Sequence, residues 1–308
     1  MGKIAFVFAG QGAQYGGMGQ SLYQSSPAAE AALDQAEALR NGTLEQCFTG
    51  SKETLSLTIN AQPCLMAVDC ACAAALIENG VVPEGLAGFS LGEVAALAVS
   101  SMLPFSEAFR LVMKRAELMH ACAQEHPGGM AAVLKLEDER VEALCKECGA
   151  YPVNYNCPGQ VVCAMAKEAM APFAGTVKAA GGRALPLNVS GAFHSPFMRT
   201  AAEKLKTYAQ TLRFSEPVVP LYANATCEPY TAGEAVTLLS AQVDHPVRWT
   251  TLIRNMLHQN YTDFIEVGAG TVLSGLIQKI GGADYIGHVE NEETLQTVID
   301  HYREVHAC

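Results

Sequence analysis

The sequence predicts an α/β fold made of two parts. An apolar run at Lys3–Phe8 is typical of a strand buried in a parallel sheet. A Gly-x-Ser-x-Gly segment at Gly88–Gly92 stands between a strand end and a helix former. From residue 128 the pattern changes to a β-α-β-β-α-β order. The chain has 308 residues, of which half are hydrophobic and only 17% are charged, so it can bury a large core.

The first strand, Lys3–Phe8, runs directly into a glycine-rich turn at residues 9–14. The glycines Gly10 and Gly12 approach a dinucleotide-binding fingerprint, but no acidic ribose ligand follows at the usual interval, so we reject a Rossmann site. The alternative is that this loop supplies backbone N–H groups. Gln11 is then a candidate second donor for an oxyanion, against the plain reading of a strand-to-helix turn.

Three segments after this turn are helical by composition: Ser25–Leu39, Ala61–Glu78 and Phe105–Gln124. The second is apolar on all sides, which predicts a helix buried between others, with Pro63 near its first turn. The third carries Arg115 among apolar residues. A solvated basic face is the default explanation, but the planar fork of an arginine also suits a buried carboxylate.

The Gly88–Gly92 segment has the context of a nucleophile elbow, because strand residues precede it and the helix former Val94–Val99 follows it. Its two glycines allow a sharp turn that projects Ser90 at the helix N-terminus. The Leu91 N–H then faces a developing oxyanion. This context predicts that Ser90 is a nucleophile and that the large part resembles an α/β-hydrolase fold.

The segment that follows predicts a small inserted subdomain of the ferredoxin-like type. Its strands are expected at residues 130–136, 151–155, 160–166 and 183–189, and its helices at 137–148 and 167–181. We therefore assign residues 128–190 to the small subdomain, and residues 1–127 and 191–308 to the large one with its parallel sheet. Cys145 and Cys148 have metal-site spacing, but they read as small apolar residues on a helix face.

After the insert, His194 is the one histidine of eight that stands at a strand-to-loop exit beside a glycine turn. A helix is expected at Phe197–Leu212, further strands at residues 218–222 and 263–267, and a helix at residues 271–280. Between Ser90 and His194 the only aspartate is Asp138, which lies in the small subdomain. A hydrolase triad is thus poorly supported, whereas a Ser-His dyad oriented by a backbone group needs no acid.

Six segments in order along the chain resemble the motifs of the malonyl-CoA:acyl carrier protein transacylases, the acyltransferase family of fatty acid and polyketide synthesis. The resemblance extends essentially from end to end. The segments are Gly10–Gln14, Gly88–Glu93, Asn156–Gln160, Ala192–Ser195, Pro246–Trp249 and Glu266–Gly270.

The resemblance implies a role for individual residues. Ser90 would be the acylated nucleophile and His194 the general base, and the N–H groups of Gln11 and Leu91 would form the oxyanion hole. The other implied residues are Arg115, which grips the malonyl carboxylate; Gln62 and Asn156, around the active site; and Arg248, whose backbone carbonyl orients the histidine.

Two positions bear on selectivity in this resemblance. Many relatives have histidine where this chain has Phe89, which leaves the dyad intact but removes one polar contact to the acyl group or thioester. Phe193, directly before the catalytic histidine, goes with malonyl rather than methylmalonyl in related polyketide acyltransferases. The expected reaction is transfer of malonyl from malonyl-CoA to the phosphopantetheine thiol of acyl carrier protein, with no bound cofactor and no metal.

Composition limits the partners and the compartment. A net charge of −11 argues against a broad nucleic-acid surface. No apolar run reaches the length of a membrane-spanning helix, and the N-terminal run is too short for a signal core, so no membrane association is expected. Eleven cysteines without such a signal indicate a reducing, cytoplasmic environment. Arg199, Lys204 and Lys206 are candidates for meeting an acidic carrier, against a solvated helix face as the default.

Three alternatives use the same residues. A serine esterase or thioesterase would hydrolyse the acyl-enzyme faster than it transfers the acyl group. A binding subunit without catalysis would not react with a serine reagent. A malonyl-transfer subunit of another malonate- or polyketide-processing system would differ in the carrier protein that it accepts.

Overall fold

The computed structural model describes residues 2–306, without the side chain of His306, and its core is a five-stranded sheet in the order β7-β2-β1-β8-β9. All four strand pairs are parallel. The strands are β1 (Lys3–Phe8), β2 (Gly85–Gly88), β7 (Leu221–Tyr222), β8 (Tyr261–Val267) and β9 (Tyr285–Val289). The central strand β1 is apolar because both of its faces are covered. Ile4, Phe6 and Phe8 join one hydrophobic cluster, and Ala5 and Val7 join another.

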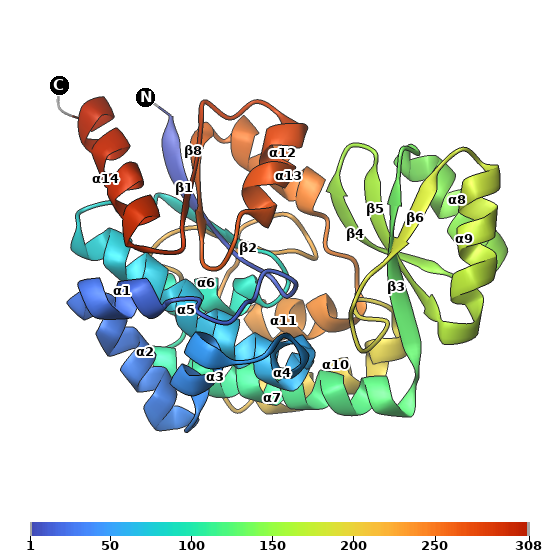
Figure 1. Ribbon diagram of the computed structural model, residues 1–308, viewed down its shortest axis with the longest axis horizontal. Helices are drawn as coiled ribbons and strands as arrows, with labels where there is room; N and C mark the ends of the chain where they lie inside the picture. The colour runs from blue at the N-terminus through green and yellow to red at the C-terminus, as the bar shows by residue number, and fades with distance from the viewer. Residues whose placement is uncertain (1, 307–308) are drawn as a thin grey trace.

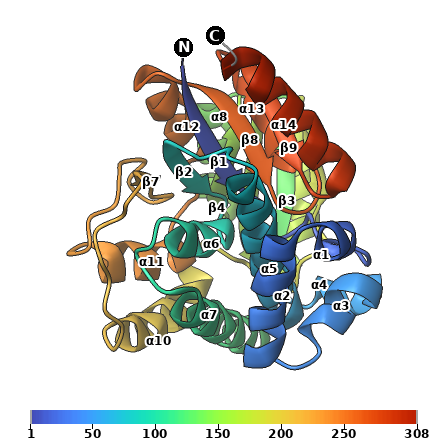
Figure 2. The ribbon, with the colours of Figure 1, turned by 90° about the vertical axis from the view of Figure 1, so that its left-hand side faces the viewer.

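Helices cover both faces of this sheet (Figure 2). The cluster on the Phe6 side is built mainly with α5, α6 and α7, and the cluster on the Val7 side with α12 and α13. The helices of this large part are α1 (Gln20–Ser25), α2 (Pro27–Leu39), α3 (Thr43–Thr49), α4 (Lys52–Ser56), α5 (Thr58–Glu78), α6 (Gly92–Val99), α7 (Phe105–Glu125), the 3-10 helix η2 (Pro196–Met198), α10 (Arg199–Ala209), α11 (Ala235–Asp244), α12 (Trp249–His258), α13 (Val272–Ile280) and α14 (Glu292–His306).

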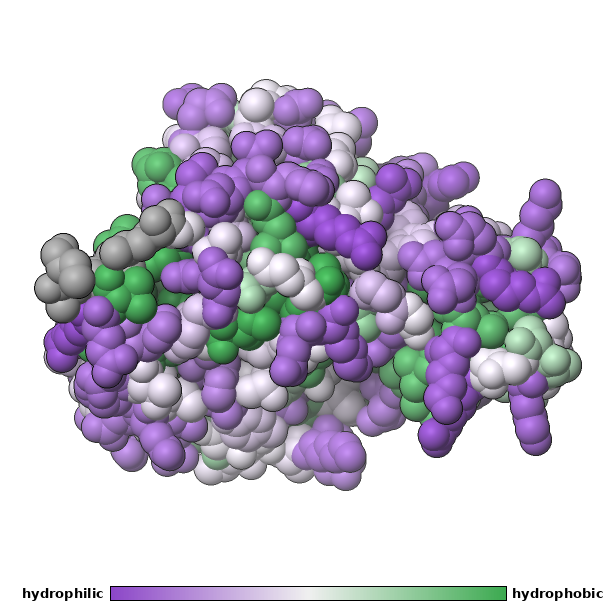
Figure 3. Space-filling model, turned by 90° about the horizontal axis from the view of Figure 1, so that it is seen from above, coloured by the Kyte–Doolittle hydropathy of each residue, from purple (hydrophilic) through white to green (hydrophobic). Residues whose placement is uncertain are grey.

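A second sheet of four antiparallel strands stands beside the first, in the order β4-β5-β3-β6. Its elements are β3 (Gly128–Leu134), α8 (Asp138–Cys148), β4 (Tyr151–Cys157), β5 (Gln160–Ala166), the 3-10 helix η1 (Lys167–Ala169), α9 (Met170–Ala179) and β6 (Arg183–Pro186). Figure 1 shows this sheet with α8 and α9 on its outer side, and Figure 3 shows the same part projecting sideways from the rest of a mostly hydrophilic surface. The predicted combination of a parallel core and a separate ferredoxin-like sheet is confirmed.

Several predicted boundaries were wrong. The strand expected at residues 218–222 is reduced to Leu221–Tyr222, and the one expected at 183–189 ends at Pro186. The helix expected at Ser25–Leu39 is interrupted, because Ser26 caps α2 and Pro27 begins it. Helix α5 begins at Thr58, so Pro63 lies inside the helix and not in its first turn.

The helix α5 also corrects an expectation about membranes. It has 21 residues and is long and apolar enough to cross a bilayer, so the expectation that no run reaches this length was wrong. Most of the helix is buried inside the protein, where it packs against α2, α6 and α7. Its uniform apolar character is therefore explained by its place in the core.

Candidate active site

The elbow at Ser90 is formed by a strand, a turn and a helix that leave no room for side chains at two positions. A Cβ on Gly88 would lie 2.0 Å from the carbonyl carbon of Gly92, and a Cβ on Gly92 would lie 2.3 Å from the carbonyl oxygen of Phe8. Ser90 itself has a φ of 56°, in the left-handed region that non-glycine residues rarely adopt. Such strain persists only where surrounding contacts hold it.

Buried amide side chains hold this conformation. The Oδ1 atom of Asn224 accepts a hydrogen bond from the Ser90 N–H at 2.8 Å, and its Nδ2 atom donates to the Gly88 carbonyl at 2.6 Å. The Nε2 atom of Gln242 donates to the Ser90 carbonyl at 2.7 Å. The elbow is thus held by residues more than 130 positions later in the chain, which were not predicted from the sequence.

Ser90 and His194 form the predicted pair. Ser90 Oγ lies 2.7 Å from His194 Nε2, and both residues are buried. His194 Nδ1 lies 2.7 Å from the carbonyl oxygen of Gln242. A carbonyl only accepts, so Nδ1 carries the proton and Nε2 is the free base that accepts from Ser90.

The orienting carbonyl was predicted at the wrong residue. Arg248 is the N-cap of α12, and its carbonyl accepts hydrogen bonds from the Leu252 N–H and the Cys227 thiol, so it is not the group on His194. Gln242 takes that place because it lies in the last turn of α11, where carbonyls lack partners within the helix. The residue four positions later is Pro246, which has no N–H to offer, and this was the one signal that the sequence held.

Arg115 lies beside the serine as a buried cation. Its Nη1 atom donates to Gln62 Oε1 at 2.6 Å, and its Nη2 atom donates to Gln242 Oε1 at 2.7 Å and to Ser90 Oγ at 3.1 Å. Burial lowers the pKa of Arg115 to about 10, although the nearby Glu93 opposes this shift. The buried alternative for this arginine, and not the solvated one, is therefore correct.

Two further ionisable groups have pKa values set by this burial. Burial and the charge of Arg115 lower the pKa of His194 to about 4, against the hydrogen bond with the Gln242 carbonyl. Burial raises the pKa of Glu93 to about 7, although its carboxyl accepts hydrogen bonds from the Tyr230 hydroxyl and the Asn224 N–H. At neutral pH the imidazole is thus neutral and able to take a proton.

The two candidate oxyanion donors flank the serine. Leu91 immediately precedes α6, and Gln11 lies in the turn after β1, where its side chain accepts from the Thr58 hydroxyl at 2.7 Å. Within the described residues, neither the Leu91 N–H nor the Gln11 N–H has a hydrogen-bond partner. Both residues line a cavity of about 70 Å³ that also holds Ser90.

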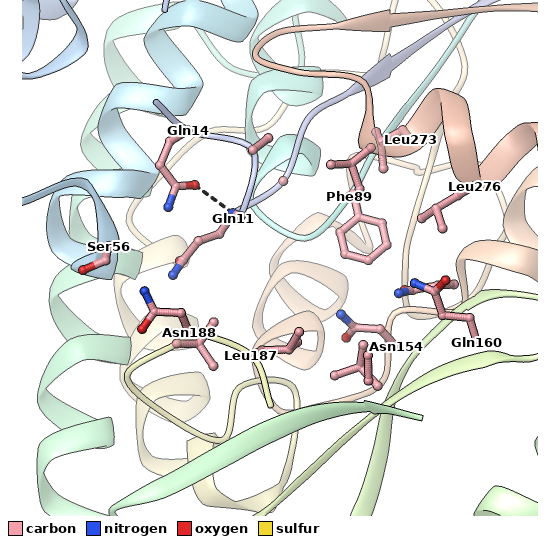
Figure 4. A pocket seen from close by; sticks show the side chains of 18 of the residues that line it. Gln11, Gln14, Ser56, Phe89, Asn154, Gln160, Leu187, Asn188, Leu273 and Leu276 are labelled. Atoms are coloured by element: carbon pink, nitrogen blue, oxygen red, sulfur yellow. Dashed lines mark hydrogen bonds between the residues drawn. The ribbon is translucent and has the colours of Figure 1, made fainter. Parts of the chain in front are cut away.

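The small cavity around Ser90 has both polar and apolar walls. Its walls include Arg115, Phe193 and two methionines, Met119 and Met130. A larger cavity of about 410 Å³ adjoins it between the two sheets and shares Gln11, Phe89 and Asn154 with it. In the larger cavity the ring of Phe89 faces Asn154 and Gln160, with Leu273 and Leu276 beside it (Figure 4).

The other predicted residues have these positions. Asn156 lines the larger cavity, whereas Gln62 is held against Arg115. Phe89 packs edge-to-face on Trp249, with ring centroids 5.4 Å apart, which gives this residue a structural role. The three cations of α10 are exposed and line neither cavity; they are Arg199, Lys204 and Lys206. Among residues 2–306, no group of three metal-binding side chains is arranged to hold a metal ion.

The chain is similar in sequence and in structure to known acyltransferases. The profile of the acyl transferase domain matches residues 5–298. The chain is 36% identical to the malonyl CoA-acyl carrier protein transacylase of Bacillus subtilis (strain 168), over 99% of this chain and 98% of that one. It is 37% identical to the protein of the same name from Escherichia coli (strain K12), over 91% and 93% of the two chains. It also matches a malonyl-transacylase solved in complex with a type II PKS acyl-carrier protein, with a TM-score of 0.93 and 34% identity over 97% of this chain and 99% of that one.

Proposed function

This chain belongs to the acyl transferase domain family, and we infer from this that it transfers malonyl from malonyl-CoA to the phosphopantetheine thiol of an acyl carrier protein, for fatty acid or polyketide synthesis. The observation that carries this inference is the contact of one serine oxygen with both His194 and Arg115. The pair with histidine makes the serine a nucleophile, and the arginine selects an acyl group that ends in a carboxylate.

The first half of the reaction acylates Ser90. As Ser90 Oγ attacks the thioester carbon, its proton passes to His194 Nε2 and the carbonyl electrons move to oxygen. The N–H groups of Gln11 and Leu91 stabilise that oxyanion. The C–S bond then breaks, and the CoA sulfur takes the proton from His194. The second half runs the same steps in reverse, with the carrier thiol giving its proton to His194 and attacking the malonyl ester.

A dyad without an acid suits transfer rather than hydrolysis. The ring N–H of His194 is held by the Gln242 carbonyl, a neutral group that adds less basicity than a carboxylate would. A thiol gives up its proton more readily than water does, so a weak base is sufficient for transfer to a carrier. The residues around the dyad also exclude water, since Ser90 and His194 are 8% and 4% exposed.

The carrier arm and CoA would share the larger cavity. Their pantetheine amides match the amide side chains of Asn154, Asn156 and Gln160, and the leucines of α13 supply apolar contact. On this proposal the protein needs no bound cofactor, because both substrates carry their own thiol. We also propose that it works in the cytoplasm, which agrees with ten unpaired cysteines among the described residues.

The test is intact mass after mixing with malonyl-CoA, with and without a phosphopantetheinylated carrier protein. We expect a malonyl adduct on the wild type that is lost when the carrier is added, and no adduct on Ser90→Ala. An adduct on Ser90→Ala would refute the nucleophile. An adduct that hydrolyses faster than it moves to any carrier would indicate a thioesterase.

A further inference from the structure

Arg115 is a buried cation whose hydrogen-bond partners are all neutral. It is 2% exposed, and it contacts two amide oxygens and one hydroxyl. Among residues 2–306, no carboxylate lies within salt-bridge distance of its guanidinium. Glu93, the acid whose charge acts on Arg115, accepts hydrogen bonds from Tyr230 and Asn224 instead. A buried charge of this kind is costly until a counter-ion arrives.

The same guanidinium restrains the nucleophile. Ser90 Oγ donates a hydrogen bond to His194 Nε2, and it accepts one from the Nη2–H of Arg115 on one of its two lone pairs. That hydrogen bond withdraws electron density from the attacking oxygen, and proton transfer places a positive charge on His194 next to the positive charge of Arg115. Both effects oppose acylation while Arg115 has no counter-ion.

We propose that the carboxylate of the bound acyl group activates the dyad: by pairing with Arg115 it releases Ser90 Oγ and removes the positive field on His194. Selection for malonyl is then expressed in the rate of acylation as well as in binding. This rests on the malonyl transfer proposed above and adds a role for the substrate carboxylate within it.

The donors of Arg115 favour such an exchange. Its Nε–H has no partner among the described residues, and Nε and Nη2 share one edge of the guanidinium plane. A carboxylate on this edge forms two parallel hydrogen bonds and displaces the Ser90 contact, which at 3.1 Å is the longest of the three. The Nη1 contact of 2.6 Å with Gln62 lies off this edge and keeps the arginine in place.

The charges around His194 agree with this role. Arg115 acts on it from α7, and backbone groups of Gln242 in α11 and of His245 directly after α11 face it; the charge of Glu93, on α6, acts on Arg115. Among the described residues, Arg115 is thus the one charged group that acts on the imidazole, and its field lowers the pKa of His194. A carboxylate on Arg115 removes that effect and makes His194 a stronger base.

The test separates the carboxylate from the acyl group. Acetyl-CoA presents the same thioester without a carboxylate, and free formate is supplied at constant ionic strength. Rapid-quench intact mass gives the acetylation rate. We expect formate to raise this rate about threefold to tenfold with saturation, as one pKa unit of base strength would. Arg115→Met should lose the effect, and Lys114→Ala, which removes a surface pair with Glu117 on the same helix, should keep it.

Acetylation that formate leaves unchanged or slows would overturn the proposal, whether or not formate competes with malonyl-CoA. Malonyl-CoA labelling of Ser90 without formate is measured in parallel. If that labelling fails, the proposed function itself is wrong; if it succeeds without formate activation of acetylation, only the role of the carboxylate is wrong.

Discussion

Replacing His194 or Glu93 with glutamine should reveal two opposite pH dependences of stability that hide each other in the wild type. The pKa of His194 is about 4 in the folded protein and about 6.5 when unfolded. The pKa of Glu93 is about 7 in the folded protein and about 4.5 when unfolded. Both residues are buried, with 4% of His194 and none of Glu93 exposed, so solvent screens neither shift appreciably.

The direction in which each residue changes stability with pH depends on whether the folded or the unfolded state binds more protons. From about pH 4 to about 6.5 the unfolded chain holds a proton on His194 that the folded protein lacks, so this residue makes stability rise with pH. From about pH 4.5 to about 7 the folded protein holds a proton on Glu93 that the unfolded chain lacks, so this residue makes stability fall with pH. Each effect totals about 3 kcal/mol, at about 1.4 kcal/mol per pH unit, and over the shared window they cancel.

The measurement is urea unfolding of the wild type, His194→Gln and Glu93→Gln from about pH 4.5 to about pH 6.5. Relative to the wild type, we expect His194→Gln to lose about 2 to 3 kcal/mol as the pH rises through this window, and Glu93→Gln to gain a similar amount. Other acids titrate equally in all three proteins, so the differences isolate these two residues. A difference from the wild type that stays constant with pH for either variant refutes the buried pKa assigned to that residue.

Three substitutions test how the elbow is held. Asn224→Ala leaves two buried backbone groups without partners and should cost about 2 to 4 kcal/mol in urea unfolding, against about 0.5 kcal/mol for the exposed cap Asn79→Ala. Gly88→Ala should abolish folding or malonyl labelling, because its Cβ would lie 2.0 Å from backbone, whereas Gly233→Ala points into open space and should be neutral by the same assays. Gln242→Met keeps the backbone carbonyl and should slow malonyl labelling about tenfold; an unchanged rate would show that its side chain positions nothing.

The local part of the site could be predicted from the sequence. The glycines of the elbow, the strand before it and the helix after it lie within a few residues of Ser90, and short-range sterics determine their conformation. The sequence left both a buried and a solvated position open for Arg115. A cation on an apolar helix can be buried only if polar groups from other parts of the chain pair with it. The sequence offered no means to name those partners.

The groups that hold the dyad could not be predicted, because they act across large separations. Gln242 is 152 residues from Ser90, and Asn224 is 134 residues from it. Asn224 follows a strand of only two residues, which no alternation pattern reveals. The orienting carbonyl was assigned to Arg248 and lies at Gln242 because a backbone oxygen carries no side-chain signal. Only the absence of a donor at Pro246 distinguished the correct carbonyl.

Because the base and the clamp meet at one oxygen, the pH dependence of acylation should depend on the substrate. At low malonyl-CoA the rate reports the free enzyme and should fall only as the pH drops towards about 4, where His194 becomes protonated. At saturating malonyl-CoA the carboxylate neutralises Arg115, so the fall should begin at a higher pH. Acetyl-CoA carries no carboxylate, so with this substrate the rate should fall at the same pH at low and at saturating concentration. Single-turnover pH jumps, which expose the protein to acid only briefly, measure both. If the rate with malonyl-CoA falls at the same pH at low and at saturating concentration, Arg115 binds the substrate without altering the base.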